Sequence, residues 1–285
     1  MTLLRLMIES DNKAAWVERS IITKFRKTVW APFLEALKQY KLISAGDKVA
    51  VCVSGGKDSM LLAKLFQELQ KHSDYQFGVE YICMNPGYNA ENLQRIKDNA
   101  ALLNVPLKFF SSDVFEAANL VGGDSPCYMC ARMRRGCLYA KAKELGCNKI
   151  ALGHHRSDVI ETTLMGMFYG GQIQGMMPRI KSANFEGMEL IRPMYCISEE
   201  DIEHWRDYNG LEFIACACSF TQKLAQSGQA RSVRQEMKEL IKELKKRNPD
   251  VEKSIFKSLH NVQLDTLVEY KTGKERHSFL EKFEK

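Results

Sequence analysis

A short loop of small and charged residues could do chemistry in this chain of 285 residues, because it joins an apolar run to a helical pattern. The run Val49–Val53 ends at Ser-Gly-Gly-Lys-Asp-Ser, residues 54–59, and a new apolar period starts at Met60. This order is typical of a buried strand, a tight turn and the first turn of a helix. Adjacent glycines let the backbone approach a ligand, and the free N–H groups of a helix N-terminus bind anions. The loop therefore predicts a phosphate-binding site.

This loop differs from the Walker motif, whose first glycine is separated from its Gly-Lys pair, because Gly55 and Gly56 are adjacent here. Lys57 would add a mobile cation, and the two flanking serines would add hydroxyl donors. Asp58 would repel phosphate unless a metal ion lay between the two. We therefore expect a phosphate site that also holds a metal ion.

A second loop, Gly-His-His-Arg-Ser-Asp at residues 153–158, also ends an apolar run and opens a helical pattern. We expect Asp158 to be a carboxylate at a helix start that faces the phosphates and holds Mg²⁺ with Asp58. His154 and His155 could ligate zinc, but adjacent residues point to opposite sides of a strand, so one should be a hydrogen-bonding core residue. The expected catalytic residues are Lys57, Asp58 and Asp158.

Two close cysteine pairs are candidates for a metal centre. Cys127 and Cys130 follow Pro126, which suits a first helical turn, so both thiols would project from the start of a helix on one face. A helix N-terminus and neighbouring arginines favour the thiolate form. Cys216 and Cys218 would face the same way in an extended segment. The spacing of the pairs leaves zinc and iron–sulfur both open.

The other cysteines are expected to pack in the interior. Cys137 shares a helical face with Cys130 but lies about 10 Å further along the helix axis, which is too far for one compact cluster. The remaining isolated cysteines, in apolar or strand-like contexts, are Cys52, Cys83, Cys147 and Cys196.

Alternating strand-like and helical patterns must position these loops. Strands are predicted at 48–53, 78–84, 106–111, 148–153 and 188–192, and helices at 58–70, 89–103, 129–145, 157–168 and 199–209. This alternation predicts an α/β fold, a doubly wound parallel sheet that binds ligands beyond the carboxyl ends of its strands. The domains are predicted as an N-terminal helical extension at 1–44, the α/β domain with the metal site at 45–225 and a C-terminal helical region at 226–285. In the last region we expect long charged helices from about residue 230, a final helix at about 250–270 and a frayed tail.

Composition narrows the class of protein. A net charge of +6 permits a nucleic-acid partner without requiring one. No stretch approaches the length of a membrane span, and the N-terminus turns charged too early for a signal peptide. With nine cysteines in such a chain, a reducing cytosol with metal-bound or catalytic thiols is the expected setting. We therefore expect a cytoplasmic protein with no membrane partner.

Together these segments resemble one known family. The chain is similar to the TtcA-like tRNA 2-thiocytidine synthetases, which are iron–sulfur tRNA thiolases among the N-type ATP pyrophosphatases with a PP-loop. The matching segments, spread over roughly residues 24–265, are residues 54–59, Cys127-Tyr-Met-Cys130, residues 152–158, Met167-Phe-Tyr-Gly-Gly171, Ile191-Arg-Pro193, Cys216 and Cys218.

The resemblance implies an ATP-dependent tRNA sulfurtransferase with an adenine nucleotide alpha hydrolase-like fold. ATP would adenylylate O2 of a tRNA cytidine at position 32, sulfur would replace that oxygen, and AMP and pyrophosphate would be released. Relatives often carry two aspartates in the second loop, and Ser157 replaces the first. The ATP-binding residues so implied, with Met84 as an adenine contact through its backbone, are Ser54, Gly55, Gly56, Lys57, Asp58, Ser59, Met84, Gly153 and Asp158.

The resemblance also implies a 4Fe–4S cluster on three cysteines, with one iron open to hold the transferred sulfur. Cys127 and Cys130 match two of the ligands, and Cys216 matches the third by counting forward from Arg192-Pro193. Relatives often show C-x-x-C at the third ligand where this chain shows C-x-C. Cys218 is therefore a possible fourth ligand.

A basic surface is expected to hold tRNA mainly through its phosphates. The alternative is an ordinary solvated charged face. The residues concerned, in segments that flank the two loops, are Arg132, Arg134, Arg135, Arg179 and Lys181. The other expected partners are a sulfur donor, either a cysteine desulfurase or free sulfide, and a second copy of the chain in a possible homodimer.

Three other functions compete with this one. A zinc nucleobase deaminase shares Pro-Cys-x-x-Cys, but His72 is followed by Ser73-Asp74 rather than by the x-Glu of that signature. The sister branch that thiolates a tRNA uridine carries extra C-x-x-C zinc modules near its termini, whereas this chain has no cysteine before Cys52 or after Cys218. A non-catalytic ATP- or RNA-binding protein with a structural zinc would be colourless and would release no AMP.

Overall fold

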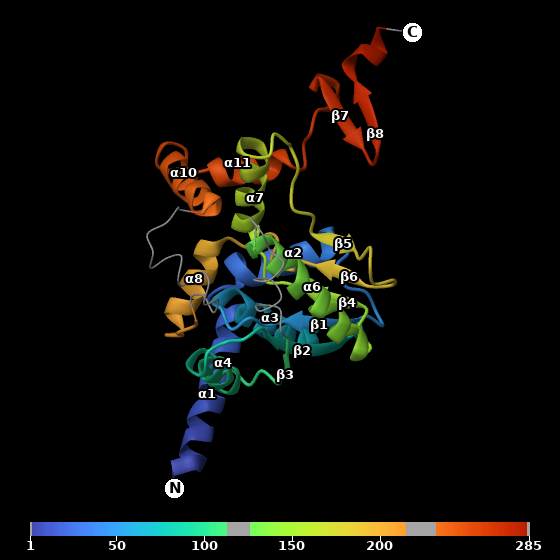
Figure 1. Ribbon diagram of the computed structural model, residues 1–285. Coiled ribbons are helices and arrows are strands. Elements are labelled where there is room, and N and C mark those ends of the chain that lie inside the picture. The colour runs from blue at the N-terminus through green and yellow to red at the C-terminus, as the bar shows by residue number, and fades with distance from the viewer. Residues whose placement is uncertain (1, 113–125, 215–231, 284–285) are drawn as a thin grey trace. The chain divides into compact units, whose positions relative to one another are not determined.

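The computed structural model describes residues 2–112, 126–214 and 232–283 (Figure 1). For residues 2–11 and 126–131 it describes the backbone alone. The chain divides into two compact units, one made of Met1–Val159 with Met176–Arg231 and the other of Ile160–Gly175 with Ser232–Lys285. No helix among the described residues is long and apolar enough to cross a membrane.

A six-stranded sheet forms the centre of the first unit, in the order β3-β2-β1-β4-β6-β5. Its strands are β1 (Lys48–Cys52), β2 (Gly78–Asn85), β3 (Leu107–Ser111), β4 (Lys149–Ala151), β5 (Arg179–Lys181) and β6 (Glu189–Ile191). All neighbours pair in parallel except β5, which runs antiparallel to β6. The mostly parallel sheet confirms the predicted fold class, and each predicted strand is present. β5 was not predicted, because its three residues offer no apolar run.

The strand order reverses direction beside β1. The chain runs from β1 outward to β2 and β3, and then returns to place β4 on the other side of β1. The loops after β1 and β4 therefore leave neighbouring strands at the same sheet edge, at the point where the strand order reverses, which is where such sheets bind ligands.

Helices of the first unit follow the predicted positions closely. They are α1 (Thr2–Ile22), the π-helix η1 (Arg26–Trp30), α2 (Ala31–Gln39), α3 (Lys57–His72), α4 (Ala90–Leu102), α6 (Pro126–Glu144) and α8 (Glu199–Tyr208). Helix α7 (Arg156–Phe168) begins in the first unit and continues into the second.

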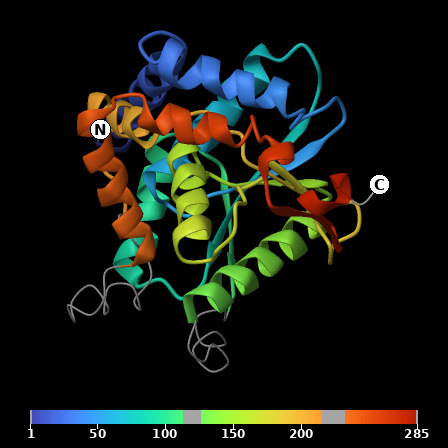
Figure 2. The same ribbon diagram turned by 90° about the horizontal axis from the view of Figure 1, so that it is seen from above.

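Two apolar clusters cover the two faces of the sheet. Val49 and Val51 of β1, and Val53 just after it, pack in one cluster with residues of α1, α2, α3, α4 and α8. Ala50 and Cys52, which alternate with those valines, pack in the other cluster with residues of α6. This alternation is the period of a strand buried on both faces. Figure 2 shows α2 and α6 on opposite sides of the sheet.

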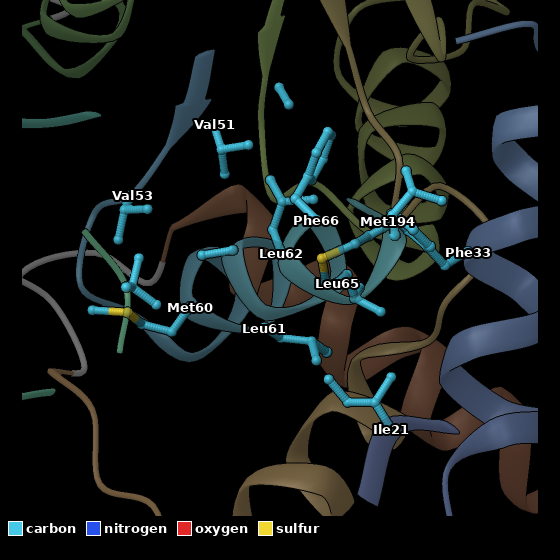
Figure 3. Packing of buried hydrophobic residues seen from close by; sticks show 14 of the residues in the cluster. Ile21, Phe33, Val51, Val53, Met60, Leu61, Leu62, Leu65, Phe66 and Met194 are labelled. Carbon is cyan, nitrogen blue, oxygen red and sulfur yellow. The ribbon is translucent and has the colours of Figure 1, made fainter. Parts of the chain in front are cut away.

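Helix α3, which follows the glycine loop after β1, packs in the larger cluster. Met60, Leu61, Leu62, Leu65 and Phe66 are all fully buried on successive turns (Figure 3). A helix that is apolar on several sides is one that neighbours cover on several sides. The first turn of α3, which follows the glycine loop, is therefore held firmly against the sheet.

The second unit has its own small core. Ile160 and Leu164 of α7 pack with Met237 and Ile241 of α10. Its other elements are α10 (Val233–Arg247), α11 (Val251–Ser258), the 3₁₀ turns at Leu264–Thr266 and Phe279–Lys282, and an antiparallel hairpin of β7 (Glu269–Thr272) with β8 (Glu275–Ser278).

The predicted helix at 250–270 and the frayed tail are corrected by this unit. Helix α11 ends at Ser258, and the tail folds back as the hairpin. Gly273 adopts φ +63° at the two-residue turn, a conformation that suits a tight hairpin. Tyr270 and His277 stack across the strands with ring centroids 4.8 Å apart. The glycine turn between two alternating runs was the sequence signal for this hairpin.

Candidate active site

A pocket of about 380 Å³ opens at the carboxyl ends of the parallel strands, where the strand order reverses. Its walls come from the ends of β1, β2 and β4, from the starts of α3 and α7 and from one side of α6. The lining residues are Cys52, Val53, Ser54, Asp58, Ser59, Met84, Tyr88, Arg134, Arg135, Leu138, Leu152, Gly153, His154 and Asp158. The two loops predicted to bind ATP thus meet in one pocket, together with Met84.

The first loop is closed by its own side chains and requires glycine. Gly55 has φ +87°, and a Cβ on it would lie 2.4 Å from Cγ1 of Ile96. The Ser59 hydroxyl accepts a hydrogen bond from Ser54 N at 3.1 Å and donates one to Gly56 O at 2.9 Å. Ser59 therefore fixes the shape of the loop from within while it lines the pocket.

Gly153 lets the second loop touch the first. A Cβ on Gly153 would lie 3.2 Å from the Asp58 carbonyl carbon and 3.2 Å from Ser59 N. Both neighbours are backbone atoms at the start of a buried helix, which cannot give way easily. The absence of a side chain at residue 153 thus sets the distance between the two loops.

One buried imidazole lies between the two aspartates. His155 is 3% exposed, and its Nε2 lies 3.8 Å from Oδ1 of Asp58 and 3.5 Å from Oδ2 of Asp158. The backbone N–H of His155 also donates to Asp158 Oδ2 at 3.1 Å. His154, by contrast, lines the pocket. The two histidines point to different surroundings, as the sequence led us to expect.

The carboxylates do not form a ready-made metal cage. Within the described parts of the chain, no three His, Cys, Asp or Glu side chains are grouped so that they could hold a metal ion. Asp58 Oδ1 is nevertheless buried, and its contact with Lys57 Nζ at 3.2 Å is an ion pair without good hydrogen-bond geometry. Mg²⁺ commonly takes only one or two carboxylates, with phosphates and waters as its other ligands. Asp58 and Asp158 fit that pattern.

Lys57, the cation of the first loop, contacts two carboxylates. Its Nζ lies 3.0 Å from Oε1 of Glu199 and 3.2 Å from Oδ1 of Asp58. Burial lowers the pKa of Lys57, but the two carboxylates outweigh it, so the net shift is upward. Glu199 was not predicted as a site residue. The sequence indicated the helix it begins, but not that this helix start would reach a loop 142 residues away.

Arginines make the side of the pocket formed by α6 cationic. Arg134 and Arg135 of α6 line the pocket, and Arg192, near Arg135, is buried. Burial, together with the nearby Arg135, lowers the pKa of Arg192 to about 10. The Arg192 guanidinium donates to the carbonyl of Met177. This wall could attract an anionic ligand.

The other predicted tRNA-binding residues lie elsewhere. Arg132 is exposed on α6. Arg179 makes a two-pronged ion pair with Glu189, at 2.9 Å and 2.8 Å, and donates to the carbonyl of Lys41 at 2.6 Å. Lys181 is exposed and pairs in register with Glu189, at the beginning of β6 rather than at its pocket end. The structure therefore brings two of the five residues to the pocket.

The predicted cluster ligands are only partly within the described residues. Cys127 and Cys130 belong to the first turns of α6, where the structure describes only the backbone. Cys216 and Cys218 lie outside the described residues. Cys52, Cys83 and Cys147 are buried as expected, and Cys52 also lines the pocket.

Cys137 and Cys196 are less buried than the core position expected for them. The Cys137 sulfur lies 3.6 Å from the Ser112 hydroxyl. Burial raises the pKa of Cys196 to about 11, and Glu35 acts in the same direction.

Tyr88 is a pocket residue that the sequence analysis missed. The side chain of Asn85 accepts hydrogen bonds from the N–H groups of Gly87, at 3.0 Å, and Tyr88, at 2.8 Å. Gly87 has φ +108° in the same turn. The Asn-Pro-Gly-Tyr sequence directly after β2 is a turn signal that could have located this aromatic side chain at the sheet edge.

Known proteins resemble this chain in sequence and in fold. The sequence model of one protein family, the PP-loop domain, matches residues 27–226. A protein of Vibrio vulnificus strain YJ016 named tRNA-cytidine(32) 2-sulfurtransferase is 33% identical over 252 residues, which cover 87% of this chain and 78% of that protein. A protein of the same name from Coxiella burnetii strain RSA 493 is 34% identical over 241 residues, 83% of this chain and 90% of that one.

A solved structure has a similar fold. The U34-tRNA thiolase NcsA from Methanococcus maripaludis, determined with its [4Fe-4S] cluster, matches with a TM-score of 0.63 and 21% identity, over 82% of this chain and 79% of that chain. At this identity the likeness concerns the fold.

Proposed function

The chain belongs to the tRNA-cytidine(32) 2-sulfurtransferase family of PP-loop proteins, and on this premise we propose that it replaces O2 of a tRNA cytidine with sulfur at the expense of ATP. The observation that carries the proposal is one pocket that combines the phosphate loop, two aspartates and the arginines of α6. Such a pocket offers groups for a triphosphate, for a metal ion and for a second anionic substrate. Its chemistry is therefore that of an adenylylating enzyme.

Each loop has a part in the proposed reaction. The N–H groups of residues 54–59 would bind the phosphates, with Lys57 as a cation. Asp58 and Asp158 would hold Mg²⁺ on the leaving pyrophosphate. The cytidine O2 would attack the α-phosphorus as the bond to pyrophosphate breaks, and sulfur would then replace the adenylylated oxygen as AMP leaves. Arg134 and Arg135 would offset the negative charge of the two substrates.

Helix α6 links the proposed sulfur site to the nucleotide site. Cys127 and Cys130 lie near its start, and Arg134 follows Cys130 by about 6 Å along the axis. Cys130 is therefore about one helical turn, and Cys127 about two turns, from a residue that lines the pocket. With Cys216, they would hold a 4Fe–4S cluster, which would supply the iron that carries the sulfur atom to be transferred.

Substitutions in the first loop test the nucleotide site. Lys57→Ala or Asp58→Ala should reduce the release of AMP and pyrophosphate at least 100-fold, an order of magnitude expected for loss of an electrostatic catalytic group. Circular dichroism should show a folded protein, because both side chains are partly exposed. The measurement is AMP formation with purified tRNA and ATP. Unchanged release from either variant would remove that residue from the site.

Analysis of the modified nucleoside tests the substrate. Protein purified without oxygen, with tRNA, Mg-ATP and sulfide, should yield 2-thiocytidine on digestion and mass spectrometry. The product 2-thiouridine would instead support the uridine branch. A colourless protein that contains zinc and releases no AMP would support a non-catalytic binding protein.

The remaining parts of the proposal concern the cell. We propose a cytoplasmic enzyme that takes its sulfur from a cysteine desulfurase or from free sulfide, and that works as a homodimer. The three-part division at residues 44 and 225 also stays a proposal. Limited proteolysis and light scattering would test the domain boundaries and the homodimer.

A further inference from the structure

The ammonium group of Lys57 has a carboxylate partner outside its own loop. Asp58 and Ser59 line the pocket, whereas the Lys57 side chain is not among the described residues that do. Lys57 Nζ instead lies 3.0 Å from Oε1 of Glu199. The two side chains are 17% and 23% exposed, so the ion pair is largely shielded from water.

The position of Glu199 is fixed by the start of α8. The Glu199 N–H donates to the Ser157 hydroxyl at 3.2 Å, and the N–H of Arg156 donates to Ile197 O at 2.8 Å. The Ser198 hydroxyl caps α8 by accepting from Asp201 N at 3.2 Å. The first turn of α8 is thus tied to the first turn of α7, which carries Asp158. The backbone from which the Glu199 side chain contacts Lys57 is therefore held in place by hydrogen bonds.

The ion pair changes what a nucleotide would meet. An ammonium between two carboxylates presents little net positive charge to a triphosphate. A phosphate oxygen that approached Lys57 would compete with Glu199 for the same N–H donors. Asp58 is a neighbour of Lys57 in the chain and can stay in contact with it, whereas Glu199 belongs to another element.

We propose that Glu199 is a positioning residue that holds Lys57 beside the phosphate loop and is displaced from it when a phosphate of the nucleotide binds. The proposal rests on the ATP site proposed above. Glu199 thereby sets the nucleotide affinity, because each binding event must break this ion pair.

The test is the affinity of Glu199→Gln for a non-hydrolysable ATP analogue with Mg²⁺, measured by calorimetry. Loss of a partly shielded ion pair should tighten binding roughly fivefold, since such pairs contribute up to about 1 kcal/mol. The affinity for adenosine, which has no phosphate, should not change. Glu200→Gln is the matched control, because it removes the same charge from the same helical turn at an exposed position.

The Lys57→Ala background separates this inference from the site assignment. If Lys57→Ala does not weaken binding of the analogue, the proposed ATP site itself is wrong. If Lys57→Ala weakens binding, Glu199→Gln should have no further effect in that background. Weaker or unchanged analogue binding by Glu199→Gln in the native background, an equal gain in Glu200→Gln, a gain for adenosine, or a gain that persists without Lys57 would each overturn the role of Glu199.

Discussion

Gly153 determines how closely the two loops of the pocket approach. Its position leaves 3.2 Å between an added Cβ and the backbone at Asp58 and Ser59, which is tighter than ordinary contact. Gly153 lies in the second of the two loops, just after β4. The pocket therefore depends on one missing methyl group as much as on its charged side chains.

Gly153→Ala should separate the two loops and impair the reaction. Overpacking of this kind costs about 1–3 kcal/mol, so the protein should fold with a lowered melting temperature. The release of AMP should fall much more than stability does, because Asp58 and Asp158 would move apart. Gly146→Ala is not a suitable control, because Gly146 has φ +71°. Gly136→Ala is suitable, since a Cβ there meets nothing within 4 Å. Full activity in Gly153→Ala would contradict the close-approach argument.

At the scale of elements, α6 joins the cysteine motif to the pocket. The helix begins at Pro126, presents Arg134 and Arg135 to the pocket and packs through Tyr139 and Ala142 against the sheet. Because it is anchored by that apolar contact, its first turns have a fixed direction. Any group held at its start would keep a constant distance from the pocket.

Serine substitutions along the chain should divide the cysteines into two groups. Cys127→Ser, Cys130→Ser and Cys216→Ser should lose iron and thiolation together, because each removes a proposed cluster ligand. Cys137→Ser and Cys147→Ser should keep both, although burial of Cys147 makes its variant less stable. Iron content, the absorption spectrum and 2-thiocytidine yield are the measurements. If Cys218→Ser loses the cluster as fully as Cys216→Ser does, the site has four cysteines and no open iron.

A buried ion network ties the strands together at the edge where they begin. Lys149 Nζ lies 2.9 Å from Asp47 Oδ2 and 3.2 Å from Glu189 Oε2, and Arg179 completes the network at Glu189. Burial acts to raise the pKa of the Asp47 and Glu189 carboxyls, but their hydrogen bonds to the cations outweigh this effect, and Asp47 also accepts one from Asn148. The pKa of each carboxyl is therefore lowered. Arg179 thus has a part in the fold, whatever its part in tRNA binding.

This network should make stability depend on pH in the acid range. A carboxyl whose folded-state pKa is lowered stabilises the fold above its unfolded pKa of about 4, and that contribution is lost as the pH falls through the lower folded value. Lys149→Met should cost about 3 kcal/mol at pH 7, since it leaves the buried Asp47 carboxylate without its cation, although Glu189 keeps Arg179. The difference in melting temperature from the native protein should shrink toward pH 3. An undiminished difference at pH 3 would contradict the electrostatic origin.

At the scale of the whole molecule, the charge is only +6, so a nucleic-acid partner depends on where the charges lie. Three arginines of α6, at residues 132, 134 and 135, are close together in the sequence, and two of them line the pocket. A tRNA whose phosphates approached this helix would bring its target base to the same side as the phosphate loop. Local rather than total charge would then guide binding.

Binding of tRNA should weaken as salt is added, because phosphate contacts release counterions. Arg134→Ala and Arg135→Ala should each lower the affinity and reduce the slope of log affinity against log salt by about 1. Arg276→Ala, an exposed arginine of the C-terminal hairpin, is the matched control and should leave the slope unchanged. Affinity that does not respond to salt between low and physiological ionic strength would exclude the phosphate-contact model.

Sequence patterns alone determined the elements and the loops that carry chemistry. The apolar run of β1, the adjacent glycines and the periodic helix after them are local features, and local features fix backbone conformation and burial. The parallel direction of the strands followed from the alternation of strands and helices. The two loops could therefore be assigned to one sheet edge from the sequence alone.

Only the tertiary structure decided which side chains meet at that edge. Glu199 beside Lys57, His155 between the aspartates and the arginines of α6 in the pocket all join segments far apart in the sequence. Arg179, by contrast, turned out to be paired with Glu189. Such contacts depend on strand order, register and helix packing, which the whole core sets together. A one-dimensional pattern records the period of each element but not the neighbour that each side chain finds.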